Sequence, residues 1–471
     1  MPTDFPSLAS RADVPQRTVQ PVDFPAGFRW GLATAAYQIE GAAHEGGRGA
    51  SIWDTFSHTP GLSHHGDTGD IACDHYHRWE RDFDLLAELG VTDYRLSVSW
   101  SRLQPAGTGA LNETAVAFYR SQLEGLRARG IRPLVTLYHW DLPQPLEDAG
   151  GWPARATAER FGEFATLVVE RLGDLATDWV TLNEPWCSSF LGYGKGAHAP
   201  GRKDYRAAAA AAHHLNLAHG LALRGIRRVR PDARVGITNI VTDIVPASPS
   251  PGDAAAAERL DAVSNRVFLD PVYLGAYSAP VHAALDPLGL ADLIEPGDLE
   301  LIAAPTDFAG INHYQRVVAH HDPEFQPFAV DERPAEPATT SFGWSVIPES
   351  LTAVLSRVAR EFTKLPLYVT ENGASYHDYV DPNGEVVDIE RVAYFDGYLA
   401  AAADAIREGV DLQGYYAWSF LDNFEWAEGY SKRFGLVYVD YRTQERIPKL
   451  SAAWYRQLIT EHQDARTAQT P

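Results

Sequence analysis

Short apolar runs alternate with longer amphipathic segments along most of this chain. In several long segments Leu, Phe and Val recur at three- and four-residue spacing, and a Gly often stands near the end. This spacing places the apolar side chains on one face of a helix. It predicts helices over His77–Gly90, Ala115–Gly130 and Glu159–Asp174, and the alanine run at 207–212 predicts a further helix.

The short runs have the length and residue types of buried β-strands. They are Phe28–Ala33, Tyr94–Val98, Leu134–Tyr138, Trp179–Leu182, Arg234–Asn239, Phe308–Ile311, Leu367–Thr370 and Gly414–Ala417. Eight alternating strand–helix units predict an α/β fold, a single (β/α)8 TIM barrel with long βα loops at one rim. A doubly wound open sheet is the rival fold, but no predicted strand is followed by its G-x-G-x-x-G signature.

No linker divides the 471 residues, and α/β barrels run long as single domains. We expect a loose N-terminal tail over 1–20, one catalytic domain over 21–460 and a C-terminal tail over 461–471. The Pro-rich stretches Pro246–Asp253 and Asp331–Thr340 are expected to be surface loops between barrel units.

Composition narrows the possible partners. The net charge of −22 repels polyphosphates and disfavours nucleic acid as a partner. The sequence has no run of about 18 apolar residues, so no membrane partner is expected. Two cysteines and an N-terminus without an apolar signal region favour a cytoplasmic protein with reduced thiols.

Polar and aromatic side chains gather where the predicted strands end, which is where barrel enzymes place their active sites. Amides and carboxylates bind hydroxyl groups, and indole faces cover the C–H face of a sugar ring. The set therefore suits a neutral polyhydroxylated ligand. It comprises Gln38, Glu40, Arg95, His139, Trp140, Asp141, Asn183, Glu184, Asn312, Tyr314, Glu371, Asn372, Trp418, Glu425 and Trp426.

Two of these carboxylates, Glu184 and Glu371, follow the fourth and seventh predicted strands. Taken alone, a Glu before Pro185 is most simply a turn residue. If the barrel places both carboxylates across a sugar-sized cleft, they form the acid/base and nucleophile pair of a glycosidase.

Five blocks of sequence, in this order, resemble the family 1 glycoside hydrolases, retaining enzymes of the β-glucosidase type on a (β/α)8 barrel. The resemblance runs from about Phe24 to about Ile459. The blocks are "FRWGLATAAYQIEGA" (28–42), "YHWDLPQPLED" (138–148), "TLNEP" (181–185), "YVTENG" (368–373) and "WSFLDNFEWAEGYSKRFGLVYVD" (418–440).

The resemblance implies a role for each candidate residue. Glu371 would be the nucleophile and Glu184 the acid/base, with Arg95, Asn312 and Tyr314 positioning Glu371 and keeping it ionised. The remaining residues divide between the two sides of the bond that is cleaved. The sugar would be held by Gln38, His139, Asn183, Tyr314, Trp418, Glu425, Trp426 and Phe434, and the leaving group would face Trp186, Cys187, Leu191 and Trp344.

The resemblance also implies a small-molecule partner and no cofactor or metal. The expected substrates are cellobiose, short cello-oligosaccharides and aryl or alkyl β-glucosides, with side activity on β-galactosides and β-fucosides. A homo-oligomer is left open.

Two alternatives remain. A 6-phospho-β-glycosidase of the same family would need positive charge near the sugar, where this chain has Glu425; Lys432 and Arg433 lie close in sequence but are expected to be a solvated pair. A metal-binding protein is the alternative from another class, because the segment 63–80 holds four His, several carboxylates and Cys73.

Overall fold

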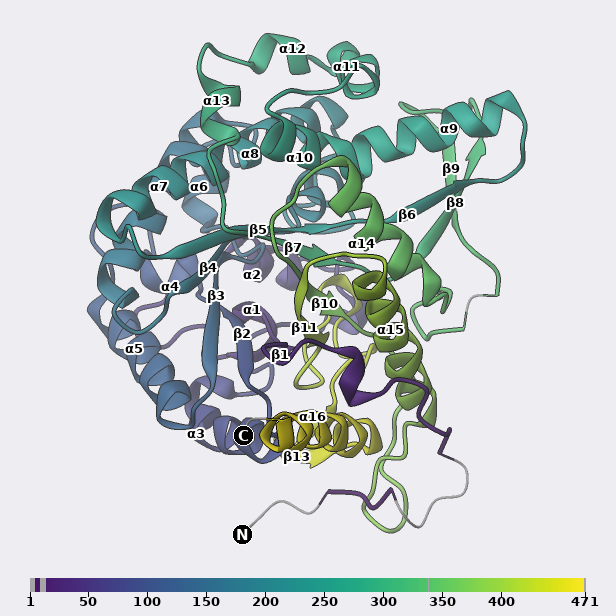
Figure 1. The fold of residues 1–471 in the computed structure, drawn as a ribbon. Helices are drawn as coiled ribbons and strands as arrows, with labels where there is room; N and C mark the ends of the chain where they lie inside the picture. Colours follow the sequence, from purple (N-terminus) through teal and green to yellow (C-terminus); the bar gives the residue numbers. More distant parts are fainter. Residues whose placement is uncertain (1–4, 9–13, 338, 470–471) are drawn as a thin grey trace.

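The computed structural model describes residues 5–8, 14–337 and 339–469. Eight parallel strands close into a barrel in the order β1-β11-β10-β7-β5-β4-β3-β2 (Figure 1). They are β1 Arg29–Ala33, β2 Asp93–Ser97, β3 Arg132–Tyr138, β4 Asp178–Asn183, β5 Arg234–Ile240, β7 Phe308–Asn312, β10 Leu367–Asn372 and β11 Leu412–Trp418.

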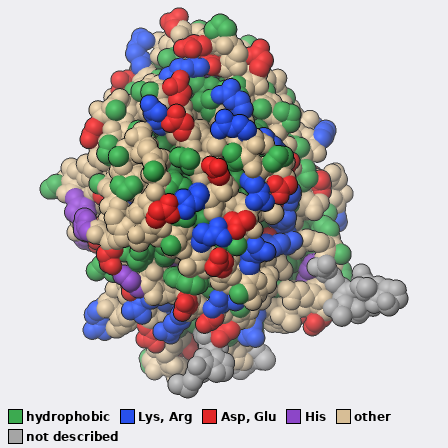
Figure 2. All heavy atoms as spheres, turned by 90° about the vertical axis from the view of Figure 1, so that its left-hand side faces the viewer, with side chains coloured by type: hydrophobic (Ala, Val, Ile, Leu, Met, Phe, Trp, Pro, Cys, Tyr) green, Lys and Arg blue, Asp and Glu red, His purple; other side chains and the backbone are tan. Residues whose placement is uncertain are grey.

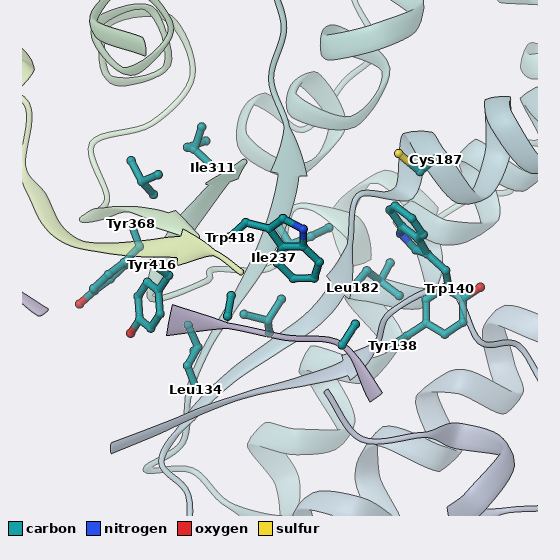
Figure 3. Close-up of a cluster of buried hydrophobic side chains, with 14 of the residues drawn as sticks. Leu134, Tyr138, Trp140, Leu182, Cys187, Ile237, Ile311, Tyr368, Tyr416 and Trp418 are labelled. Carbon is teal, nitrogen blue, oxygen red and sulfur yellow. The ribbon is translucent and has the colours of Figure 1, made fainter. Parts of the chain in front are cut away.

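All eight predicted strands are confirmed, and their ends differ from the prediction by at most a few residues. The barrel closes through β1 and β11, where Arg29 lies opposite Gly414 and Ala33 opposite Trp418. The strands are almost entirely buried because side chains fill the barrel and helices cover its outside. Figure 3 shows apolar side chains such as Leu134, Ile237 and Ile311 around the strands.

Helices surround the barrel, and the predicted ones are confirmed as α3, α5, α7 and α8. The longest, α8, contains the alanine run and is capped by Asp204, whose carboxylate accepts from the backbone N–H groups of Arg206 and Ala207. The helices are α1 Ala36–Ile39, α2 Ile52–His58, α3 His75–Leu89, α4 Trp100–Leu103, α5 Glu113–Ala128, α6 Gln144–Asp148, α7 Arg155–Leu172, α8 Tyr205–Val229, α9 Pro251–Asp261, α10 Val267–Leu269, α11 Ala279–Leu285, α12 Leu290–Leu293, α13 Asp298–Ile302, α14 Glu349–Glu361, α15 Ile389–Arg407 and α16 Leu450–Gln469.

Two small sheets lie outside the barrel. Strands β12 Val437–Asp440 and β13 Glu445–Pro448 pair antiparallel. Strands β6 Asp243–Pro246, β8 Arg316–His321 and β9 Val330–Pro334 form a three-stranded sheet beside α9 (Figure 1). The two Pro-rich stretches are therefore not simply loops: the first joins β6 to α9, and the second begins within β9.

The division into one domain with two tails stays a prediction, but both of its boundaries fall within packed structure. Helix α16 continues past residue 460, and buried His462 accepts a hydrogen bond from the Trp30 indole at 3.2 Å. Before residue 21, Val19 is buried, and the backbone N–H of Thr18 donates to Asp396 at 2.8 Å. Residues 1–4, 9–13 and 470–471 of the predicted tails lie outside the described residues.

Charged side chains of both signs are interspersed on the face of the molecule in Figure 2. Exposed pairs such as Arg120–Asp174, at 2.7 Å, join neighbouring parts of this surface. Over residues 5–8, 14–337 and 339–469, no helix is long and apolar enough to cross a membrane.

A buried ion cluster supports the loops that follow β10 and β11. Arg391 of α15 contacts Asp388 and, at 2.7 Å, Asp378, and all three side chains are almost fully buried. Lys449 joins Asp378 to Asp422 at 2.5 and 2.7 Å. Since these carboxylates are cut off from water, each depends on its cation for stabilisation.

We expect Arg391→Met to lower the free energy of unfolding by about 3–5 kcal/mol, because it leaves buried carboxylates without their partner. Urea unfolding followed by tryptophan fluorescence measures the change. The matched control is Arg407→Met, since Arg407 lies on the same helix, is 58% exposed and pairs with exposed Asp404. The control should change the free energy by no more than about 1 kcal/mol; equal effects of the two substitutions would contradict the prediction.

Candidate active site

A cavity of about 510 Å³ lies at the carboxyl ends of the barrel strands. It has a size typical of small-molecule sites. Most of the predicted site residues line it: His139, Glu184, Trp186, Cys187, Leu191, Tyr314, Trp344, Glu371, Trp418, Glu425, Trp426 and Phe434. The other predicted residues, Gln38, Arg95, Asn183 and Asn312, are buried beside it and contact its lining.

Glu184 follows β4 with a left-handed backbone, at φ 45°. This conformation is uncommon for a residue other than Gly and costs of order 1–3 kcal/mol. The fold holds it there: its backbone N–H donates to Thr238 at 2.9 Å, and its carboxyl accepts from Asn312 at 2.6 Å and from the Cys187 thiol at 3.0 Å. The turn therefore directs the carboxyl into the cavity.

The second carboxyl, Glu371, lies at the end of β10 and has different partners. The guanidinium of Arg95 contacts its Oε1 atom, and the Tyr314 hydroxyl donates to its Oε2 atom at 2.7 Å. Arg95 is fully buried. The contact therefore pairs two buried groups of opposite charge.

A chain of polar contacts joins the two carboxyls. Arg95 also donates to the side-chain oxygen of Asn183 at 2.6 Å, and Asn312 donates to the same oxygen at 3.1 Å and to Glu184. Asn312 was expected to support Glu371; this was wrong, because its amide donates to Glu184. Thr370 fixes this orientation by donating to the Asn312 oxygen at 2.7 Å.

The environment raises the pKa of Glu184 above its usual value. Burial is the largest cause, because it penalises the charged form, and the neighbouring charge of Glu371 adds to it. A raised pKa is what a carboxyl requires to hold its proton and act as a proton donor near neutral pH.

A third carboxyl, Glu425, lies at the inner end of the cavity. Burial, followed by the charge of Glu371, raises its pKa to about 8. The Gln38 amide donates to it at 3.3 Å and to Asn423 at 2.9 Å, while the Gln38 oxygen has no partner among the described residues. This end of the cavity therefore offers both donors and acceptors to a ligand.

His139 lies between aromatic rings in the same region. Its ring stacks against Trp418 and Trp426 at centroid distances of 5.9 and 5.8 Å. Burial and the charge of Arg95 lower its pKa well below the usual value, so the ring is neutral near pH 7. The Asn183 amide contacts it at 3.1 Å. The groups of the Asn183 amide thus all have protein partners, and its expected contact with a sugar hydroxyl stays a prediction.

Three of the four predicted leaving-group residues lie on or beside η3 (Cys187–Lys195), a π-helical segment that follows Glu184. Trp186, Cys187 and Leu191 all line the cavity from this side. Figure 3 shows Cys187 on this segment, with Trp140 below it and Trp418 at the end of its strand.

Much of the outer wall of the cavity is formed by residues outside the predicted set. Trp140 was noted at a strand end but given no role; its ring lies 4.5 Å from that of Trp426. Phe342 stacks on Trp344 at 4.2 Å and could have been found from its neighbour. Ile240, the last residue of β5, was also missed. The other missed lining residues lie outside the barrel strands: Ala197, His198, Thr242, Ile244, Leu260, Ser264, Gln315, Val317, Glu332, Arg333, Pro334, Gly343, Ala427 and Glu428.

Lys432 and Arg433 are not the solvated pair that was expected. Arg433 forms an ion pair with buried Asp422 at 2.6 Å and is mostly buried. Lys432 donates to the backbone oxygen of Ser341 at 2.7 Å. Both cations therefore have protein partners of their own, so they give no support to a phosphate site beside Glu425.

The His-rich segment 63–80 uses its polar groups in separate contacts. His75 contacts Asp82 at 2.7 Å, and His77 contacts Asp74 at 2.6 Å. The Cys73 thiol donates to the backbone oxygen of Asp422 at 3.0 Å. Across the part of the chain that the structure describes, no three His, Cys, Asp or Glu side chains are grouped to hold a metal ion.

Comparison with known proteins agrees with this geometry. Residues 20–464 match the model of glycosyl hydrolase family 1. Beta-glucosidase A of Acetivibrio thermocellus is 43% identical over 93% of this chain and 98% of its own length. A bifunctional beta-D-glucosidase/beta-D-fucosidase of Bifidobacterium breve is 45% identical over 93% of this chain and 98% of its own.

A solved structure is similar throughout its length. The family 1 β-glucosidase of Thermotoga maritima, in complex with isofagomine lactam, superposes with a TM-score of 0.90 at 42% identity. The match covers 93% of this chain and 99% of that one. The chain therefore belongs to glycosyl hydrolase family 1.

Proposed function

We propose that Glu371 is the nucleophile and Glu184 the acid/base in the removal of terminal nonreducing β-D-glucosyl residues. The chain is a retaining β-glucosidase of family 1. The observation that carries the proposed roles is the difference between the two carboxyls' partners. Glu371 contacts a guanidinium and a phenol, whereas Glu184 contacts an amide and a thiol.

In the first step the Glu371 carboxylate attacks the anomeric carbon while Glu184 gives its proton to the departing oxygen. The bond to the leaving group breaks and a glycosyl ester forms on Glu371. Esterification removes the charge of Glu371, so the repulsion that favours protonated Glu184 disappears. Glu184 can then take a proton from water, whose oxygen attacks the anomeric carbon and releases Glu371.

Aryl and alkyl β-glucosides, cellobiose and short cello-oligosaccharides are the substrates we propose. Gln38 and Glu425 would hold hydroxyls at the far side of the sugar, with Trp418 as its platform and Phe434 closing one wall. The Bifidobacterium breve relative, named as both a glucosidase and a fucosidase, supports side activity on β-fucosides.

We also propose a cytoplasmic location. Cys73 and Cys187 are both free and buried. Unpaired cysteines are typical of reducing compartments.

Wild-type enzyme acting on an aryl β-glucoside should release β-glucose first, because two inversions at one carbon give net retention. Proton NMR of the first-formed anomer measures this. Glu371→Gly should abolish hydrolysis, and Glu184→Ala should form a β-glycosyl azide when azide is added. An initial α-anomer would contradict the two-step mechanism.

The pH dependence of kcat/KM should show an alkaline limb from Glu184, because the group acts as an acid only while it holds its proton. Activity therefore falls as pH rises through the raised pKa of Glu184. In Glu371→Gln the like charge is gone, so the pKa of Glu184 should fall, while burial keeps it above its usual value. Carbon-13 NMR titration of labelled Glu side chains measures it; an unchanged pKa would contradict the coupling.

The sugar 6-phosphate should be a poor substrate, because a phosphate dianion beside Glu425 would be buried, and the nearby cations Lys432 and Arg433 already have protein partners of their own. We expect kcat/KM for p-nitrophenyl β-glucoside to exceed that for its 6-phosphate by at least about 100-fold. A 6-phosphate hydrolysed as fast as the glucoside would favour the phospho-glycosidase alternative.

A further inference from the structure

The three-stranded sheet of β6, β8 and β9 lies outside the barrel and beside α9 (Figure 1). Its register places Ile244 opposite Val317, and Val317 opposite Pro334. All three residues line the cavity that contains Glu184 and Glu371. One row of apolar side chains, one from each strand, therefore faces the active site.

Alternation along β6 and β8 shows that one face of these two strands is turned toward the cavity. Thr242 and Gln315, two positions before Ile244 and Val317, also line it. The intervening residues Asp243 and Arg316 do not; they form an ion pair at 2.6 Å. Side chains two apart share a face of a strand, as this pattern requires.

The apolar row lies farther from the catalytic carboxyls than the polar row, which consists of Thr242 and Gln315. Gln315 is adjacent in the chain to Tyr314, whose hydroxyl contacts Glu371. Two residues of strand separate the rows, a rise of about 6.5 Å. A leaving group thus passes Thr242 and Gln315 before it reaches Ile244, Val317 and Pro334.

Other walls of this outer part are apolar as well. Trp186, Leu191, Leu260 and the stacked rings of Phe342 and Trp344 line the cavity. The charges at its rim are paired within the protein. Lys195 contacts Glu332, and Arg333 donates to Asp331 at 2.7 Å.

We propose that the face of this sheet selects the leaving group, and that it favours an apolar alcohol or phenol over a second glucose. The inference rests on the proposed β-glucosidase activity and adds the class of leaving group. Hydroxyl groups of a second sugar would lose water against Ile244, Val317 and Pro334 without gaining a partner, which costs free energy. Methylene or aromatic carbons would instead lower the free energy of binding when they leave water for this row.

Hydrolysis of n-alkyl β-glucosides from methyl to octyl tests the proposal. The longer alcohols in this series differ little as leaving groups, so differences among them report contacts rather than bond chemistry. We expect kcat/KM to rise about two- to fourfold for each methylene that reaches the row, and cellobiose to fall at least about tenfold below octyl glucoside. A flat response to chain length, or cellobiose exceeding octyl glucoside, would overturn it.

Val317→Thr places a hydroxyl in the row at nearly the same volume, and should flatten the dependence on chain length. Val318→Thr is the matched control: the next residue of β8 does not line the cavity, so this variant should keep the wild-type slope. If Val317→Thr fails to fold, Ile244→Thr gives the same readout. If kcat/KM depends on alkyl chain length equally in the wild type and in the folded Val317→Thr or Ile244→Thr variant, the sheet face is not the selecting surface.

The series also separates failure of this inference from failure of the proposed function. If the chain hydrolyses every alkyl glucoside at one rate, the β-glucosidase activity is supported, and the proposal that the sheet face selects the leaving group is rejected. If it hydrolyses none, and p-nitrophenyl β-glucoside is also untouched, the proposed function itself fails.

Discussion

The contact between Arg95 and Glu371 is the interaction on which the rest of the site depends. Arg95 projects from β2 and reaches Glu371 and the Thr370 backbone on β10 and Asn183 on β4. It thereby joins three strands of the barrel through one guanidinium. Without it, a carboxylate would be buried with no compensating charge, a loss of several kcal/mol. The charge of Glu371 adds to the effect of burial, which is the larger cause of the raised pKa of Glu184.

The same charge also affects Glu425 at the inner end. Burial and Glu371 raise its pKa to about 8, so a protonated carboxyl there can both donate to and accept from hydroxyls. With neutral His139 nearby, the inner end suits an uncharged polyol. Glu184, Glu371 and Glu425 thus serve different purposes, although all share one residue type, because their hydrogen-bond partners differ.

The barrel and the position of Glu184 and Glu371 at its rim could be predicted because most strands are short apolar runs that end in polar residues. Which group a side chain reaches was harder to predict. Asn312 lies opposite Glu371 in the pairing of β7 with β10, yet a register shift in this pair leaves its amide on Glu184. The outer sheet could not be predicted. Its strand β9 is a short edge strand that is rich in charge and ends in Pro334, and such a pattern is typical of a loop.

Chemistry and leaving-group choice occupy different parts of this fold. Glu184, Glu371 and Arg95 are fixed by barrel strands, whose register is set by closure of all eight. The outer wall comes from β6, β8, β9 and η3, which take no part in that closure. Substitution of Ile244 or Val317 therefore alters what the cavity accepts without moving the carboxyls, because nothing in the barrel ladder passes through this sheet. A rigid barrel with an independent wall lets one reaction serve different leaving groups.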